Sequence, residues 1–273
     1  MTQTNCLIII GMHRSGTSLF AGWLHRCGVR LGEDLLGANY TNPTGHFEDN
    51  DFLRLHKAIL LDNGLDYKVQ DRKEITISPQ REDEIKRLVN KKITKNKNEL
   101  WGWKEPRTSL FLDSYLKFIP SAKVVIIYRP AEEVVASLIS RERKKIKRRL
   151  NKIAMLKDLA LQKLNETDKV KMYLKVWDEY NSSIIETCEK LTKDQFRLFS
   201  MQDIVKSPGD VLSNIESLVG KGNITSTDIN QIFRKINKDE YLIEKSRKLK
   251  EEFPKLLETE MKLNALRSIS SPN

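Results

Sequence analysis

The fold of this chain is decided near its start by residues 7–20, LIIIGMHRSGTSLF. The apolar, β-branched beginning of this stretch predicts a fully buried strand, which Gly11 ends. Thr17 and Ser18 then open an amphipathic stretch, which predicts a helix. A strand, a short polar loop and a helix N-terminus form a phosphate cradle, because the first amides of a helix are unpaired and its dipole favours negative charge. We therefore expect residues 11–18 to bind an anion.

The glycine spacing of this loop resembles that of a nucleotide-binding P-loop. Gly11 and Gly16 are separated by four residues, as in the pattern G-x-x-x-x-G-K-[ST]. Thr17, however, stands where a nucleoside triphosphatase needs lysine, and the cation of the loop is Arg14 instead. The loop therefore suits a phosphate but is poorly built for a γ-phosphate with its magnesium ion. An ordinary glycine turn is the alternative, but the strand, the loop, the hydroxyls and the helix together favour the cradle.

The composition limits the class of protein but does not identify a ligand. The chain has 39% hydrophobic and 31% charged residues, which is typical of a soluble globular protein, and a net charge of +11. That charge favours anionic ligands, which include nucleotides, nucleic acid, acidic glycans and anionic lipid surfaces. No stretch approaches the roughly 20 apolar residues of a membrane span, and the first residues lack the basic region of a signal peptide. Three cysteines without metal-ligand spacing are interpreted as reduced thiols, so we expect a cytoplasmic protein without signal peptide or membrane anchor.

Three later apolar stretches predict strands, at residues 100–103, 124–128 and 196–199. The first three strands of the chain are each followed by a predicted helix, which indicates a central parallel sheet flanked by helices, an α/β fold with a helix-rich C-terminal half. In such a sheet the ligand binds at the carboxyl ends of the strands, and Gly11, Lys104 and Arg129 all fall there.

Several further expectations concern the helices and the domain organisation. Asp49 is a plausible cap for a helix that follows it, a helix is expected at 79–90 with a polar loop at 91–98, and residues 152–188 are interpreted as long helices. We expect one domain over residues 1–273, with a helical insert at about 141–190 and a helical C-terminal region at about 226–266.

Three segments resemble the signatures of sulfotransferases that use 3′-phosphoadenosine 5′-phosphosulfate (PAPS). GMHRSGTSL, residues 11–19, is similar to their 5′-phosphosulfate loop. The segment WGWKEPRTSLFLDSYLKFIPSAKVVIIYRPAEEVVASLISR, residues 101–141, resembles their second signature, and SMQDIVKSP, residues 200–208, a third. The resemblance is closest to the bacterial and Golgi-type enzymes, which include the tyrosylprotein sulfotransferases.

This resemblance implies a set of residues that bind the donor, with no metal required. The loop residues expected to hold the phosphosulfate are Gly11, His13, Arg14, Ser15, Gly16, Thr17 and Ser18. Arg129 and Ser137 match the arginine and serine that bind the 3′-phosphate, and the planar fork of arginine suits a terminal phosphate. Arg141 either extends that site or begins the basic run. The product nucleotide is then 3′-phosphoadenosine 5′-phosphate (PAP).

Sulfuryl transfer needs an in-line approach and donors near the leaving group. Arg14, the loop amides and Lys104 are the candidates; Lys104 matches the lysine of a similar K-D-P segment in tyrosylprotein enzymes, although Glu105 replaces its aspartate. Lys104 as a mere ion-pair partner of a glutamate is the alternative. The acceptor must also lose a proton, so a general base is expected within hydrogen-bond reach. The candidates lie in GHFEDND, and Glu48 is preferred over His46 because G-x-F-E recurs in the bacterial relatives.

Other interpretations stay open at this stage. Residues 141–149, RERKKIKRR, form either an exposed helix face or a site for an anionic acceptor or surface, and a nucleic acid is disfavoured because interleaved aromatics are missing. Trp177 and Tyr180 either stack on an adenine or belong to the core. The acceptor is undefined, with a carbohydrate-like hydroxyl favoured over an amine, and so is the oligomeric state. The rival functions are a P-loop small-molecule kinase and a non-catalytic polyanion-binding protein.

Overall fold

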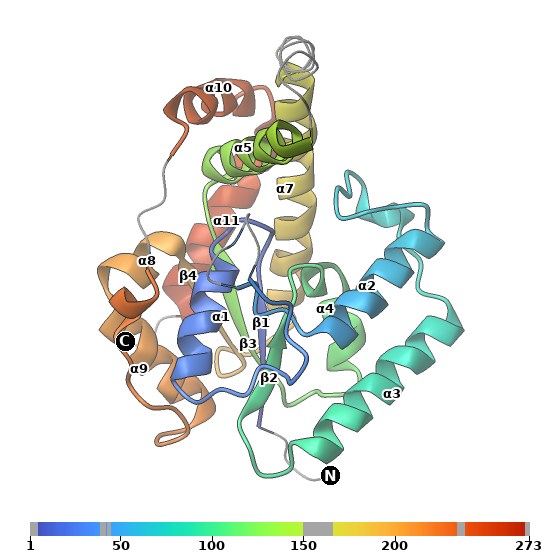
Figure 1. Cartoon of the computed structure of the whole chain (residues 1–273), viewed down its shortest axis with the longest axis vertical. Helices are drawn as coiled ribbons and strands as arrows, with labels where there is room; N and C mark the ends of the chain where they lie inside the picture. The colour runs from blue at the N-terminus through green and yellow to red at the C-terminus, as the bar shows by residue number, and fades with distance from the viewer. Residues whose placement is uncertain (1–4, 39–41, 43–44, 150–165, 234–237, 271–273) are drawn as a thin grey trace.

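A four-stranded parallel sheet forms the centre of the molecule (Figure 1). The computed structural model describes residues 5–38, 42, 45–149, 166–233 and 238–270. The strands are β1 (Cys6–Ile10), β2 (Trp101–Lys104), β3 (Lys123–Tyr128) and β4 (Phe196–Ser200). Their order is β2-β1-β3-β4, and every neighbouring pair is parallel. The predicted α/β class and all four predicted strands are therefore confirmed.

The register of the sheet brings the strand ends to one edge. Ile9 of β1 is paired with Lys104, the last residue of β2, and Ile10 is paired with Ile126 of β3. Because all four strands run the same way, the segments that follow them emerge at this common edge. The loop after Gly11, the side chain of Lys104 and the start of the segment at Arg129 therefore lie there, as expected.

Helices cover both faces of the sheet, because its strands are apolar on both sides. The helices are α1 (Thr17–Arg26), α2 (Asn50–Asp62), α3 (Pro79–Lys95), α4 (Thr108–Leu116), α5 (Ala131–Arg149), α7 (Glu166–Cys188), α8 (Met201–Lys206), α9 (Pro208–Val219), α10 (Glu240–Lys250) and α11 (Pro254–Ser270), with short 3₁₀ turns at Arg72–Glu74 and Ile229–Gln231. Alternate residues of β1 point into two cores. Ile8 packs in a core with residues of α2, α4, α5 and α7, whereas Ile9 packs in a core with α1, α8 and α9.

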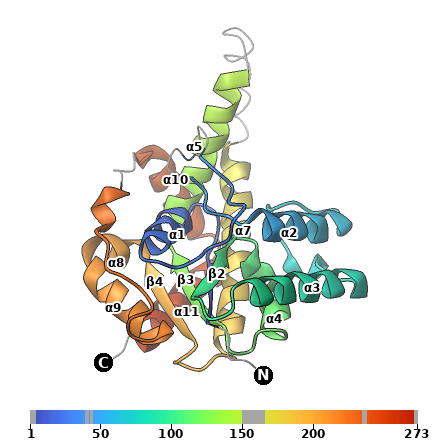
Figure 2. The ribbon, with the colours of Figure 1, turned by 60° about the horizontal axis from the view of Figure 1, so that its bottom comes forward.

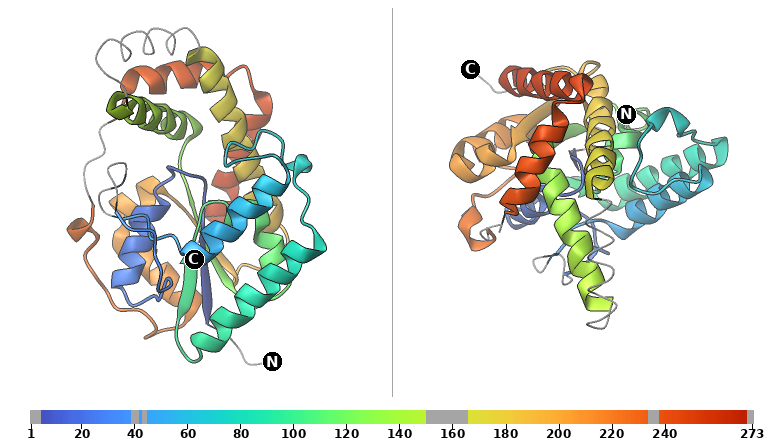
Figure 3. Two further views of the ribbon diagram at one scale, coloured as in Figure 1. Left: turned by 45° about the vertical axis from the view of Figure 1, so that its right-hand side comes forward. Right: turned by 90° about the horizontal axis from the view of Figure 1, so that it is seen from above.

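The helices α5, α7 and α10 rise beyond the carboxyl edge of the sheet (Figures 1 and 2). Helix α5 packs against both α7 and α10, and the side view of Figure 3 shows α5 and α10 lying next to each other there. These helices therefore wall the edge at which the predicted ligand-binding residues emerge.

The helix boundaries depart from the sequence analysis in two places. In the C-terminal region expected to be helical from about residue 226, the described residues before α10 form only a 3₁₀ turn at Ile229–Gln231, and α10 begins at Glu240. Asp49 caps α2 by accepting a hydrogen bond from the amide of Asp51, as expected. The polar loop predicted at 91–98 is wrong, because α3 continues to Lys95. Lys92 forms ion pairs with both Asp49 and Asp51, so the start of α2 stabilises this last turn. The helix expected at 152–165 lies outside the described residues.

Gly102 provides a test of the β1–β2 packing. A Cβ atom at Gly102 would lie 1.7 Å from the carbonyl oxygen of Leu7, which no side-chain rotation can relieve. We expect Gly102→Ala to lower the free energy of unfolding in urea by about 3 kcal/mol. Gly209→Ala is the control, because a Cβ there meets nothing within 4 Å, and its stability should change by less than about 1 kcal/mol. Equal stability of the two variants would contradict the strand register.

Candidate functional site

The loop between β1 and α1 is held in a tight, partly strained conformation. Gly11 has φ +142°, and a Cβ atom there would lie 2.1 Å from the carbonyl oxygen of Ile127. Gly16 has φ +98°, and a Cβ there would lie 2.3 Å from the sulfur of Met201. Arg14 also has a positive φ of 72°, which is unfavourable for a side chain with a Cβ. Strain held by the surrounding structure is common at ligand-binding loops.

The first turn of α1 is open to an anion. Its N-cap is Gly16, no described side chain caps it, and it carries no acidic residue. The N-termini of α2, α3 and α8 are capped by the side chains of Asp49, Ser78 and Ser200 instead. Because α1 lacks such a cap, its first amides and the helix dipole are available to a negatively charged ligand.

A buried lysine links this helix start to the predicted base. Lys104 has no exposed surface, and its Nζ donates to Glu48 Oε1 at 2.9 Å and to Ser18 Oγ at 3.2 Å. Burial lowers the pKa of Lys104, and the Glu48 carboxylate opposes that change by stabilising the ammonium. Glu48 is brought here by the start of α2, where Phe52 stacks on Trp103 of β2 with ring centroids 4.1 Å apart.

His46 lies beside this pair. Its Nδ1 is 4.0 Å from Glu48 Oε1. Burial lowers the pKa of His46, although the Glu48 carboxylate acts in the opposite direction. The imidazole is therefore neutral at pH 7 and can accept a proton.

A second cationic group lies where β3 ends and α5 begins. Arg14 donates from Nε to Ser137 Oγ at 3.0 Å, and Arg129 approaches the carbonyl oxygen of Arg14 at 3.5 Å. Burial lowers the pKa of Arg14 to about 10, helped by the charges of neighbouring arginines. Glu133 holds Arg129 in place by accepting from its Nε at 2.6 Å. The structure thus brings Arg14 of the first signature into contact with Arg129 and Ser137 of the second.

His13 lies between the loop and a set of aromatic and basic side chains. Its ring is 5.1 Å from the ring of Tyr67 and 5.9 Å from that of Tyr180. Burial lowers the pKa of His13 well below its usual value. Four positive charges reinforce this lowering, those of Arg107, Arg141, Lys104 and Arg14. The positive charges around this neutral imidazole are not balanced by it, so a bound anion would stabilise them.

Unpartnered polar atoms gather at the same place. Among the described residues, eight buried side-chain nitrogen or oxygen atoms have no hydrogen-bond partner. Four of these eight surround the loop, and they are His13 Nε2, Ser15 Oγ, Arg107 Nε and Arg141 Nε. Buried polar atoms normally have partners, so such a cluster indicates a bound group. Three of the four are donors on cations or a hydroxyl, which suits phosphate and sulfate oxygens.

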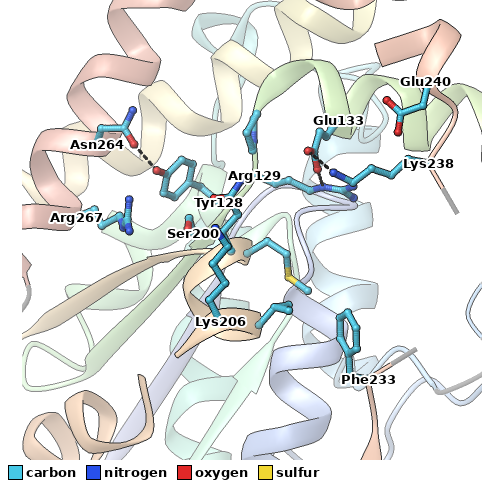
Figure 4. A pocket seen from close by; sticks show the side chains of 14 residues that line it. Tyr128, Arg129, Glu133, Ser200, Lys206, Phe233, Lys238, Glu240, Asn264 and Arg267 are labelled. Carbon is cyan, nitrogen blue, oxygen red and sulfur yellow. Dashed lines mark hydrogen bonds and ion pairs between the residues drawn. The ribbon is translucent and has the colours of Figure 1, made fainter. Parts of the chain in front are cut away.

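A pocket of about 720 Å³ opens on the β3–β4 side of the loop (Figure 4). Its lining combines side chains from the ends of β3 and β4, from α8 and from the C-terminal segment: Tyr128, Arg129, Pro130, Glu133, Ser200, Met201, Gln202, Val205, Lys206, Phe233, Lys238, Glu240, Asn264 and Arg267. Lys238 donates to Glu133 Oε1 at 2.8 Å, opposite Arg129. The sequence analysis did not identify Met201, Phe233 and Lys238 as lining residues. The one available signal was the resemblance of residues 200–208 to a sulfotransferase signature, which includes Met201.

Other aromatic and basic residues considered from the sequence have partners within the protein. Trp177 and Tyr180 have no exposed surface and bond to the carbonyl oxygens of Arg129 and Tyr67, in agreement with the core interpretation. His56 is buried, between Glu105 and Tyr115. In the basic run, Arg143 pairs with Glu166 and Asp239. Among the residues of this run whose side chains the structure describes, Lys144, Lys145 and Lys147 are exposed.

Comparison with known proteins supports a fold rather than a sequence family. A family model described as U3 small nucleolar RNA-associated protein 6 matches residues 209–269, less than a quarter of the chain. This short match within the helical C-terminal region does not show membership of that family. No curated protein matches the chain in sequence.

Solved structures of bacterial sulfotransferases do resemble the chain. A sulfotransferase from Mycobacterium tuberculosis matches with a TM-score of 0.52 and 14% identity, covering 91% of this chain and 76% of its own. A sulfotransferase from Mycobacterium avium matches with a TM-score of 0.52 and 14% identity, and the match covers 98% of this chain and 76% of the other. A sulfotransferase from Alicyclobacillus acidocaldarius matches with a TM-score of 0.51 and 12% identity, and the match covers 98% of this chain and 97% of the other. The chain therefore has a sulfotransferase fold.

No helix among the described residues is both long and apolar enough to span a bilayer. No group of three or more His, Cys, Asp or Glu side chains among them is arranged to hold a metal ion.

The lowered pKa of His13 predicts an acid-sensitive stability. The folded state keeps this imidazole neutral, whereas the unfolded chain takes up a proton below about pH 6.5, so stability falls as the pH falls. Between about pH 6 and pH 5, His13→Gln should lose less free energy of unfolding than the wild type, by up to about 1.4 kcal/mol per pH unit. Urea denaturation at each pH measures this difference. Parallel curves would show that the folded protein tolerates a charged His13.

Proposed function

We propose that this chain is a PAPS-dependent sulfotransferase that transfers a sulfuryl group to a hydroxyl, or an amine, of an acceptor. The observation that carries the proposal is the cluster of unpartnered donors and cations around residues 11–18 in a sulfotransferase fold. A donor with a phosphosulfate at one end and a 3′-phosphate at the other needs two separate anion sites. The loop would supply the first of these sites, and the pair of Arg129 and Ser137 would supply the second.

The donor would lie across the β1–β3 crevice. The amides of Gly16, Thr17 and Ser18 would bind the 5′-phosphosulfate, together with Arg14, His13 and the unpartnered hydroxyl of Ser15. The Ser15 amide donates to the carbonyl oxygen of Met12 at 3.2 Å and closes the loop instead. Arg129 and Ser137 would bind the 3′-phosphate. Arg129 also lines the large pocket, where Met201 and Phe233 offer apolar surface for an adenine ring. Ligands of open α/β sheets bind in this position, where the strand order reverses.

The residues on the β2 side would carry the proton transfer. Glu48 would accept the proton of the acceptor hydroxyl, and the acceptor oxygen would then form a bond to sulfur as the bond from sulfur to the phosphate oxygen breaks. Lys104 and Arg14 would neutralise the charge that develops on the transferring group and on the leaving phosphate. His46, 4.0 Å from Glu48, is the alternative base. PAPS supplies the activated sulfuryl group, so no metal ion is needed for these roles.

Loss of Arg129 should weaken nucleotide binding selectively. A charge-assisted hydrogen bond contributes about 1.5–3 kcal/mol, so Arg129→Ala should weaken PAP binding by roughly one to two decades in calorimetric titration. ATP should bind poorly to the wild type, because Thr17 replaces the lysine of a P-loop. Arg87→Ala, an exposed change on α3, is the control and should leave PAP affinity unchanged. Preference for ATP over PAP would favour a kinase instead.

The base is tested by separating chemistry from donor binding. Glu48→Gln should lower the rate of PAP formation in single turnover by roughly 10²–10⁴-fold, while PAP affinity changes little. His46→Gln should lower that rate by less than about tenfold. If His46→Gln lowered the rate more than Glu48→Gln does, His46 would be the general base instead of Glu48. If both variants kept the wild-type rate, neither Glu48 nor His46 would act as the general base.

A further inference from the structure

The outer half of α5 carries three lysines that no described carboxylate neutralises. Lys144, Lys145 and Lys147 are exposed, and none of them forms an ion pair with a described residue. Arg143 of the same run, in contrast, is held by Glu166. The three lysines therefore produce a positive field at this end of the helix, in a chain whose net charge is already +11.

The acidic residues of α5 do not offset this field. Each described carboxylate of the helix has its own cation partner: Glu132 with Lys250, Glu133 with Arg129 and Lys238, and Glu142 with Lys68. Cations at the C-terminal end of a helix also interact favourably with its dipole. That structural role would be satisfied without any ligand, so a test of a second role must measure something other than stability.

Helix α5 extends past the helix that lies beside it. Lys250, the last residue of α10, pairs with Glu132 near the start of α5, whereas Asp239, just before α10, pairs with Arg143. The two helices therefore run antiparallel, and the lysines that follow Arg143 lie beyond the start of α10. This part of α5 projects from the molecule on the side where residues 11–18 emerge from the sheet (Figures 1 and 2).

One stripe of α5 leads from the loop toward these lysines. Ser137 accepts from Arg14 of the loop, and Arg141, one turn further along, donates to Tyr67. Lys144 follows Ser137 by seven residues, which is two helical turns, so it lies on the same stripe about 10 Å further out. An anion that meets the outer end of α5 therefore has cations along one line toward the loop.

We propose that the outer half of α5 is an electrostatic guide that draws the anionic donor nucleotide from solution toward the loop. This inference rests on the proposed function, because the nucleotide is the ligand of that site. The lysines lie about 10–15 Å along the helix from Ser137, so they would speed association without holding the bound nucleotide. The screening length is about 30 Å at 0.01 M salt and about 3 Å at 1 M, so salt would abolish the effect.

The test compares two variants from which equal charge has been removed. The first changes the lysines of α5 and is K144Q, K145Q and K147Q combined. The second changes exposed cations on or just after α3, away from the outer end of α5 (Figure 1), and is K86Q, R87Q and K97Q combined. Glutamine is a good helix former, so both variants should fold. Surface plasmon resonance with PAP gives the association and dissociation rate constants of each.

At about 0.01 M salt the α5 variant should associate with PAP about fivefold more slowly than the wild type, whereas its dissociation rate constant should change by less than about twofold. The α3 variant should keep both rate constants within about twofold of the wild type. At about 1 M salt the three proteins should associate at the same rate. Adenosine 5′-phosphate, which has one phosphate instead of two, should show a smaller difference than PAP.

Three results would count against one or other proposal. Equal slowing of association in the two variants would overturn the guide, because net charge alone would then explain it. Faster dissociation from the α5 variant with unchanged association would also overturn it, because the lysines would then contact the bound nucleotide. If the wild type failed to bind PAP at any salt concentration, the proposed function itself would be overturned.

Discussion

The site depends on one buried ammonium that keeps its charge only through its partners. A charge without exposed surface costs several kcal/mol unless it is paired and hydrogen-bonded. Lys104 meets that condition at the end of β2, where Glu48 and Ser18 both accept from its Nζ. The side chain of Lys104 therefore links the end of β2 to the segment before α2 and to the start of α1. The stacking of Phe52 on Trp103 holds α2 against β2 and keeps Glu48 within reach.

The remaining charges around the loop are balanced only in part. Three carboxylates pair with cations around the loop, in the pairs Glu48–Lys104, Glu105–Arg107 and Glu133–Arg129, and Glu133 also pairs with Lys238. Arg14 and Arg141 bond instead to the neutral hydroxyls of Ser137 and Tyr67 in the described part of the chain. Arg14 additionally has a left-handed backbone. Unneutralised cations and backbone strain are unfavourable to the free protein, and an anion bound among them would relieve the repulsion, which is how such a site favours its ligand.

The sequence predicts what depends on local pattern. Apolar stretches predicted the four strands, and parallel pairing then placed Gly11, Lys104 and Arg129 at one edge without further information. The length of α3 was missed because ion pairs from Lys92 to another helix stabilise its last turn. Arg107 was likewise missed, since its unused edge exists only once Glu105 has bound its other side. Such features arise from packing between distant segments and have no local signal.

The order of the strands suits the proposed transfer reaction. β1 is central, so the loop that follows it lies between β2 on one side and β3 and β4 on the other. The large pocket and Arg129 belong to the β3–β4 side, whereas Glu48 and Lys104 belong to the β2 side. In the proposed reaction, a group held at the loop would be approached from the β2 side, and its leaving group would depart toward β3. In-line displacement requires that opposition, and a sheet in which β1 lay at the edge would offer only one side.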